Sequence, residues 1–121
     1  MIVEDTEFMR MAIRDTLFKH GHEVVAEVAD EEEAIQRYLE AKPDLVLMDI
    51  IAPDNVPDNM NWKQLLSKFL IVDHEAKIAM FSSLGRQVLI TESMKIGAMG
   101  FIVNPFEPGM LNVIRIIAEP N

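Results

Sequence analysis

Five short apolar runs alternate with five longer stretches of helical periodicity, and this alternation constrains the fold more than any other feature of the chain. The apolar runs are 2–3, 24–28, 44–48, 77–81 and 100–103, and a helix-like stretch follows each of them. Strands that alternate with helices form a parallel sheet, because each helix carries the chain back across the sheet to the next strand. The sequence therefore predicts one α/β domain over residues 1–121, a doubly wound five-stranded parallel sheet with helices on both faces.

The first two helices have the clearest boundary signals. Apolar and small side chains recur along 9–17 at spacings of three and four, and Gly21 follows as a candidate C-terminal cap. Asp30 is a candidate N-cap for the second helix, with Glu33 as its capping-box partner. The expected apolar face of this second helix consists of Ala34, Ile35, Tyr38 and Leu39.

Charge limits the classes of partner. Half of the 121 residues are hydrophobic, so the chain has enough apolar side chains for a buried core. Lys and Arg total 11 against 20 Asp and Glu, which gives a net charge of −9. So acidic a surface repels phosphate backbones, and we expect no direct nucleic-acid binding. A metal ion or a basic partner surface fits this charge better.

The chain contains no cysteine, which excludes disulfides, thiolate metal sites and cysteine nucleophiles. No apolar run approaches the roughly 20 residues that a membrane-spanning helix needs. The N-terminus lacks the basic start and the long apolar stretch of a signal peptide. We therefore expect a cytoplasmic protein without a membrane partner.

Acidic residues follow two of the predicted strands. Glu4 and Asp5 come directly after the first strand and Asp49 after the third. Ligands of open parallel sheets bind at the carboxyl ends of the strands, so we expect the three carboxylates to converge there. Like charges so close repel one another unless a cation joins them, and Mg²⁺ (or Mn²⁺) prefers such oxygen ligands. A carboxylate supported by a metal can attack phosphorus and form an aspartyl phosphate.

Two further residues are candidates for the same edge of the sheet. Ser82 ends the fourth strand, where its hydroxyl could donate to a phosphoryl oxygen. Phe101 lies in the fifth strand, beside that serine in the expected strand order, and its ring could rotate inward when the serine moves. The simpler alternatives are an ordinary strand-end serine and a phenylalanine that only packs in the core.

Four stretches of the chain carry a family resemblance: IVEDTEFMRMAIRDTL (2–17), PDLVLMDI (43–50), AKIAMFSSLG (76–85) and GAMGFIVNPF (97–106). Together they resemble the receiver domains of two-component response regulators, and most of all the stand-alone chemotaxis regulators of the CheY type. The resemblance implies a flavodoxin-like sheet with strand order 2-1-3-4-5. It also implies a signalling switch that takes a phosphoryl group from a histidine kinase or phosphotransfer protein and acts on a downstream effector protein. Such a switch catalyses only its own phosphorylation and dephosphorylation, so we do not expect an enzyme with an external substrate.

The resemblance further implies a role for each matching residue. Asp49 is the expected phosphoacceptor, Ser82 the switch hydroxyl and Phe101 the switch aromatic residue. The expected metal ligands are Asp49, Asp5, Glu4 through water, and the backbone carbonyl of Ile51.

Two departures from the family pattern leave a second interpretation open. Asn104 stands where the family has a lysine, and an asparagine amide donates a hydrogen bond but carries no charge. The segment 53–61 makes the connection after Asp49 longer than in the family and contains two prolines. We therefore expect weakened phosphorylation or output. The alternative is a degenerate receiver that binds partners without phosphorylation. A flavodoxin-like flavin carrier shares the architecture, but the chain has acids where such a protein has a phosphate-binding loop.

The first helix has a second apolar stripe outside its core face, formed by Phe8, Met11 and Phe18. Exposed apolar groups near a reactive site often mark a protein contact. In the resembling family this helix meets the helix bundle of the kinase or phosphotransfer protein. The alternative is that these side chains pack under neighbouring loops.

Overall fold

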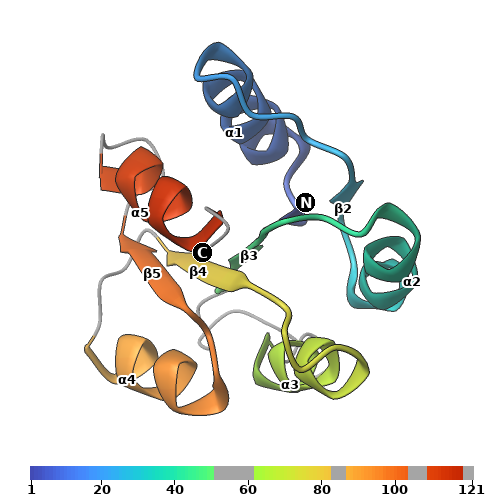
Figure 1. Ribbon diagram of the computed structural model, residues 1–121, viewed down its shortest axis with the longest axis vertical. Coiled ribbons are helices and arrows are strands. Elements are labelled where there is room, and N and C mark those ends of the chain that lie inside the picture. The colour runs from blue at the N-terminus through green and yellow to red at the C-terminus, as the bar shows by residue number, and fades with distance from the viewer. Residues whose placement is uncertain (51–61, 83–86, 104–108, 119–121) are drawn as a thin grey trace.

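The computed structural model describes residues 1–50, 62–82, 87–103 and 109–118, in which strands and helices alternate along the chain (Figure 1). The elements are β1 (Ile2–Val3), α1 (Glu7–Lys19), β2 (Glu27–Val28), α2 (Glu31–Ala41), β3 (Val46–Asp49), α3 (Trp62–Val72), β4 (Ile78–Ser82), α4 (Gln87–Ile96), β5 (Gly100–Val103) and α5 (Gly109–Ala118).

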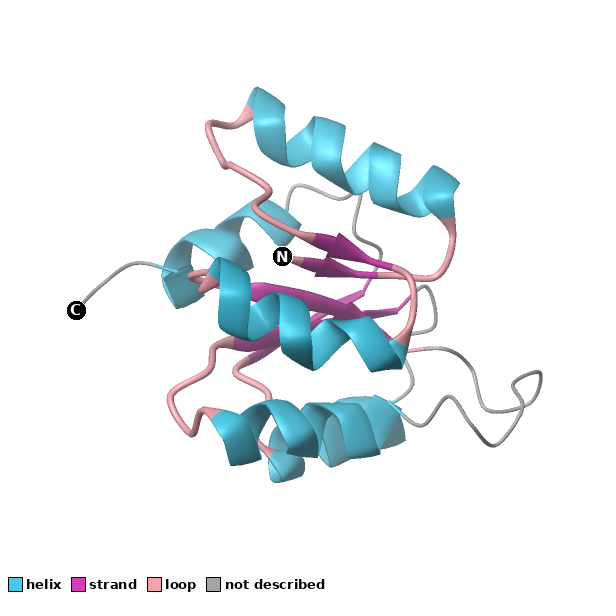
Figure 2. Ribbon diagram, turned by 90° about the vertical axis from the view of Figure 1, so that its right-hand side faces the viewer, coloured by secondary structure: helices cyan, strands magenta, loops and turns pink. Residues whose placement is uncertain are grey.

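The strands form one parallel sheet in the order β2-β1-β3-β4-β5, which confirms the expected topology. Helices α1 and α5 cover one face of the sheet, and α2, α3 and α4 cover the other (Figures 1 and 2). Within the described segments, no helix is long and apolar enough to cross a membrane.

The core consists of two apolar clusters, one on each face of the sheet. Successive residues of a strand point to opposite faces. Val46 and Met48 therefore join the cluster beneath α2, α3 and α4, whereas Leu47 joins the cluster beneath α1 and α5. Strand β4 is buried along its whole length. Burial on both faces explains why the central strands read as continuous apolar runs in the sequence.

Two predicted helix caps are confirmed. Gly21 has a φ of 83°, and its N–H and that of His22 donate to carbonyls of the last turn of α1. This pattern of two bonds around a left-handed glycine is a Schellman motif. At the start of α2, Oδ1 of Asp30 accepts a hydrogen bond of 3.0 Å from the N–H of Glu33.

Two details of the sequence prediction were wrong. The second strand was expected over 24–28 but covers only Glu27–Val28, because it is an edge strand whose one neighbour, β1, is equally short. Leu39 was expected on the apolar face of α2, yet it is 51% exposed. The buried line of that helix runs through Ala34 and Tyr38, four residues apart, and Leu39 lies about 100° further round the helix axis than Tyr38.

Tyr38 joins α2 to α3. Its ring meets the ring of Phe69 edge to face at a centroid distance of 5.3 Å, and its hydroxyl donates a 2.6 Å hydrogen bond to Oδ2 of Asp73. Burial, followed by this bond, raises the pKa of the Tyr38 hydroxyl, and the same bond lowers the pKa of Asp73. The carboxylate of Asp73 thus gives the Tyr38 hydroxyl a hydrogen-bond acceptor beside the apolar core.

Candidate functional site

The register of β1 on β3 brings the predicted carboxylates together. Val3 is paired with Met48, so the residues that follow them, Glu4 and Asp49, lie side by side at the carboxyl edge of the sheet. Oxygen atoms of Glu4, Asp5 and Asp49 all lie within 4.8 Å of one another. The structure thus shows the convergence that the sequence predicts, whereas the roles of the three residues remain predictions.

The three carboxylates differ in their exposure to solvent. Glu4 is only 4% exposed, Asp49 is half-buried and Asp5 is exposed. Burial raises the pKa of Glu4 to about 8. Hydrogen bonds with Asp49 and Asp5 and the charge of Asp49 act in the same direction, while the hydrogen bond from the N–H of Thr6 opposes them. Burial also raises the pKa of Asp49, and the charge of Asp5 adds to this effect, while a hydrogen bond with Glu4 opposes it. In the absence of a cation, the cluster therefore holds protons at a pH where free carboxylates are ionised.

The donor set fits a divalent cation. One oxygen of Glu4, Oε1, accepts a 3.0 Å hydrogen bond from the N–H of Thr6. The other, Oε2, is buried. With the neighbouring carboxylates ionised, it is the one buried side-chain oxygen or nitrogen among the described residues that has no hydrogen-bond partner. A buried polar atom without a partner is unfavourable, so Oε2 is expected to bind a proton, a water molecule or an ion. Carboxylate oxygens are the ligands of hard cations such as Mg²⁺, and the exposure of Asp5 leaves the cluster open to solvent.

We expect the cation-free protein to lose stability as the pH rises from about 5 to about 8. Since the folded-state pKa of Glu4 is raised to about 8, the folded state keeps a proton that the unfolded state releases near pH 4.5. The free energy of unfolding then falls with increasing pH through this window. A loss of a few kcal/mol is expected, because each unit of pKa shift corresponds to about 1.4 kcal/mol.

Urea unfolding in EDTA at a series of pH values measures this effect. Saturating Mg²⁺ should remove most of the pH dependence, because a bound cation stabilises the ionised carboxylates. In Glu4→Gln the dependence in EDTA should be much smaller than in the wild type. A wild-type free energy of unfolding that stays constant across the window in EDTA would contradict the prediction.

The connection between β1 and α1 holds residues that the sequence analysis did not single out. Besides its bond to Glu4, Thr6 donates from Oγ1 to Oδ1 of Asp5 at 3.3 Å. Nη1 of Arg10 donates to the backbone carbonyl of Glu4 at 2.7 Å, and its Nε lies 4.0 Å from Oε1 of Glu27. The available signal was a basic residue five positions after an acidic pair, but a surface arginine gives the same pattern.

Ser82 and Phe101 lie close to the expected positions. Ser82 is the last residue of β4 and is 3% exposed. Since Asp49 pairs with Phe81, Ser82 lies one residue further along the neighbouring strand, at the same edge as the acidic cluster. Phe101 is half-buried and is paired with Met80, two residues before the serine, while the direct partner of Ser82 is Val103. Both switch roles remain predictions.

Three further predictions concern residues outside the described segments: the backbone carbonyl of Ile51, the side chain of Asn104 and the connection 53–61. The predicted partner surface on α1, in contrast, is described. Phe8 is 75% exposed, Met11 45% and Phe18 77%. These side chains therefore do not pack under loops in the described part of the chain.

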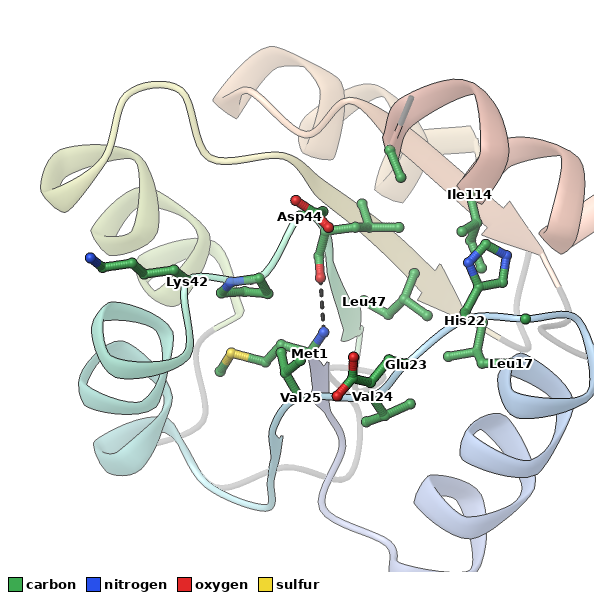
Figure 3. A pocket seen from close by; sticks show the side chains of 14 residues that line it. Met1, Leu17, His22, Glu23, Val24, Val25, Lys42, Asp44, Leu47 and Ile114 are labelled. Atoms are coloured by element: carbon green, nitrogen blue, oxygen red, sulfur yellow. Dashed lines mark hydrogen bonds between the residues drawn. The ribbon is translucent and has the colours of Figure 1, made fainter. Parts of the chain in front are cut away.

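A separate hollow of about 290 Å³ lies at the opposite edge of the sheet, where β1 and β3 begin (Figure 3). Its walls come from the connections before β2 and β3 and from α5, and they include His22, Lys42 and Ile114. The amino group of Met1 donates to the carbonyl of Leu45 at 2.9 Å within it (dashed line in Figure 3). None of the three clustered carboxylates lines this hollow, so it is distinct from the acidic site.

Comparison with known sequences gives one consistent result. The response regulator receiver domain family matches residues 1–114. The chemotaxis protein CheY of Thermotoga maritima is 41% identical over 89% of this chain and 86% of its own. CheY of Bacillus subtilis is also 41% identical, over 88% of this chain and 85% of its own.

Solved structures agree with the sequence relatives. CheY of Borrelia burgdorferi, in a complex with CheX, BeF₃ and Mg²⁺, superposes with a TM-score of 0.84 at 28% identity, over 98% of this chain and 87% of its own. The response regulator domain of Thermotoga maritima CheB gives a TM-score of 0.80 at 27% identity, over 99% and 95% of the two chains. With its strand order, its acidic edge and these relatives, the chain belongs to the family of response regulator receiver domains, and within it to the CheY type.

Proposed function

We propose that this domain is a phosphoacceptor switch of a two-component signalling system. In the proposed reaction, a carboxylate oxygen of Asp49 attacks the phosphorus of a phosphohistidine on a kinase or phosphotransfer protein. The new oxygen–phosphorus bond replaces the phosphorus–nitrogen bond, and the released ring nitrogen takes a proton from solvent, so that the histidine leaves as a neutral imidazole. The observation that carries the proposal is the cluster of three carboxylates within 4.8 Å, with an unpartnered buried oxygen on Glu4.

Several residues at the carboxyl edge of the sheet would contribute to this phosphoryl transfer. Glu4 and Asp5 would hold a divalent cation beside Asp49, and Mg²⁺ is the proposed ion because the donors are all oxygens. When bound, the cation offsets the negative charge of the carboxylates and of the phosphoryl oxygens. The hydroxyl of Ser82 would then donate to a phosphoryl oxygen, and Phe101 would respond to the movement of the serine. No external substrate is turned over in this scheme.

The comparisons support the proposal by analogy. The similar CheY of Borrelia burgdorferi was crystallised in a complex that also contains CheX, BeF₃ and Mg²⁺. We extend this to a cytoplasmic role in chemotaxis, in which a histidine kinase or phosphotransfer protein donates the phosphoryl group and a downstream protein reads the result. The exposed stripe of Phe8, Met11 and Phe18 on α1 is the surface that we propose for the donor protein.

Incubation with acetyl phosphate and Mg²⁺, followed by mass spectrometry of the intact protein, tests the proposal. We expect a mass gain of one phosphoryl group that is absent when EDTA replaces Mg²⁺. The gain should disappear after treatment with hydroxylamine, which cleaves acyl phosphates. The absence of a mass gain with every small phosphodonor and with a phosphorylated kinase would contradict the proposal.

Asn104 favours a second candidate function, a receiver that binds partners without phosphorylation. The family lysine would place a positive charge near the phosphoryl group, and asparagine does not. Charge-assisted hydrogen bonds are roughly twice as strong as neutral ones. If phosphorylation is nevertheless the function, Asn104→Lys should accelerate the mass gain from acetyl phosphate by roughly tenfold or more, since 1.4 kcal/mol of stabilisation corresponds to tenfold in rate.

The rate of phosphorylation, measured under the same conditions for both proteins, checks this prediction. Gln36→Lys is a suitable control, because it also replaces a neutral amide by lysine, at an exposed position of α2 outside the acidic cluster, and it should leave the rate unchanged. Equal rates in the wild type and Asn104→Lys would mean that another group supplies the missing charge. A wild type that is inert and an Asn104→Lys variant that becomes phosphorylated would favour the degenerate receiver.

A further inference from the structure

We propose that Arg10 is a positioning residue that holds the Glu4–Asp5 segment in the geometry required for divalent-cation binding. The inference rests on the proposed function, because it assigns Arg10 to the same acidic site. It concerns a side chain of α1 that contributes no ligand atom of its own.

The contacts of Arg10 extend in two directions. Its Nη1 donates to the carbonyl oxygen of Glu4 at 2.7 Å, a distance typical of a charge-assisted hydrogen bond. Its Nε lies 4.0 Å from Oε1 of Glu27 on β2, and Oε2 of the same glutamate accepts a 2.7 Å bond from Nη1 of Arg14. The Arg10 side chain is 18% exposed, against 42% for Arg14. Arg10 is thus held between the edge strand and the end of β1.

The bond to Glu4 acts on the backbone that carries two of the carboxylates. The carbonyl of Glu4 belongs to the peptide unit that joins Glu4 to Asp5, so its direction determines how the backbone enters Asp5. Only residues 4–6 connect β1 to α1, which leaves this turn little length to adapt. Residues that orient the ligands of a metal typically change its affinity 10- to 100-fold when they are replaced.

A positioning role and a purely electrostatic role of Arg10 predict opposite effects of its removal on the affinity for a divalent cation. Arg10 is a cation close to an anionic site, so by Coulomb repulsion its removal should strengthen the binding of a divalent cation. If instead its main effect is to hold the Glu4 carbonyl, its removal should weaken binding. The sign of the change therefore separates the two roles.

The experiment is a titration of the full chain with MgCl₂ by isothermal calorimetry at one fixed pH and ionic strength. We expect Arg10→Met to weaken Mg²⁺ binding about tenfold, at the lower end of the range for residues that orient ligands. Arg14→Met is the matched control: it removes the same charge and a contact with the same Glu27, but it does not touch Glu4. Its affinity should stay within about twofold of the wild type, because exposed charges are screened. Circular dichroism is the check that both variants are folded.

Arg10→Lys and Arg14→Lys provide a second pair that keeps every charge and is less disruptive to folding. A single ammonium group cannot reproduce the fork with which Arg10 reaches Glu4 and Glu27. We therefore expect weaker Mg²⁺ binding in Arg10→Lys than in Arg14→Lys. Equal affinities within both pairs, or tighter binding in Arg10→Met, would overturn the positioning role while leaving the phosphoacceptor proposal intact. A wild type that binds no Mg²⁺ would overturn both.

Discussion

Asp49→Asn is expected to abolish phosphoryl transfer to this protein. An amide oxygen is far less nucleophilic than a carboxylate, and no other acidic side chain among the described residues both ends a strand and lies against Glu4. The mass gain with acetyl phosphate and Mg²⁺ should fall below detection. The same substitution removes one charge from the cluster, so the pKa of Glu4 should fall towards its ordinary value. The stability of the variant in EDTA should therefore depend less on pH than that of the wild type.

Asp44→Asn is the matched control for this experiment. Asp44 is exposed and lies just before the start of β3, so the two substitutions alter the same charge at opposite ends of one strand. Asp44→Asn should be phosphorylated at the wild-type rate. If Asp49→Asn still gained a phosphoryl group, peptide mapping would identify another acceptor, and Asp49 would lose its assigned role.

Phe69→Ala is expected to destabilise the domain by about 3–5 kcal/mol, the usual cost of removing a fully buried aromatic side chain. Phe69 is 0% exposed and belongs to the cluster beneath α2, α3 and α4. Its removal also takes away the ring against which Tyr38 packs edge to face. Since a domain of this size has a total stability of about 5–15 kcal/mol, such a loss can leave the protein marginally folded.

Urea unfolding followed by circular dichroism measures this loss. Phe8→Ala makes the same chemical change on α1, where the ring is 75% exposed, and should alter the free energy of unfolding by less than about 0.5 kcal/mol. A loss in Phe69→Ala as small as the one expected for Phe8→Ala would show that the side chain of Phe69 contributes little to the core.

Local patterns in the sequence were sufficient to predict the alternation of strands and helices and hence a parallel sheet, whereas the strand order was predicted from the family resemblance. The alternation of apolar runs and helical periodicity is visible within short windows, and the caps at Gly21 and Asp30 depend on residues only a few positions away. The two errors arose where tertiary context decides. The length of β2 depends on how far β1 extends beside it, and the exposure of Leu39 depends on how α2 sits over the edge of the sheet.

The acidic cluster was predictable for a different reason. All strands of a parallel sheet end at the same edge, so residues that follow different strands meet there whatever their separation in sequence. The contacts of Arg10 and Thr6 could not be predicted in this way. They depend on the path of a three-residue turn and on the rotation of α1, neither of which leaves a periodic signal in the sequence.

The pairing of Val3 with Met48 has a consequence for how the domain assembles. A slip of one position between these two strands would turn every side chain of β1 to the wrong face, and it would also move Glu4 out of line with Asp49. The proposed ion site and the correct strand alignment thus depend on the same contact between segments 45 positions apart in the chain. High-affinity binding of Mg²⁺ would therefore indicate that β1 and β3 are paired in the native register. A folding intermediate that lacks this pairing should bind Mg²⁺ weakly or not at all.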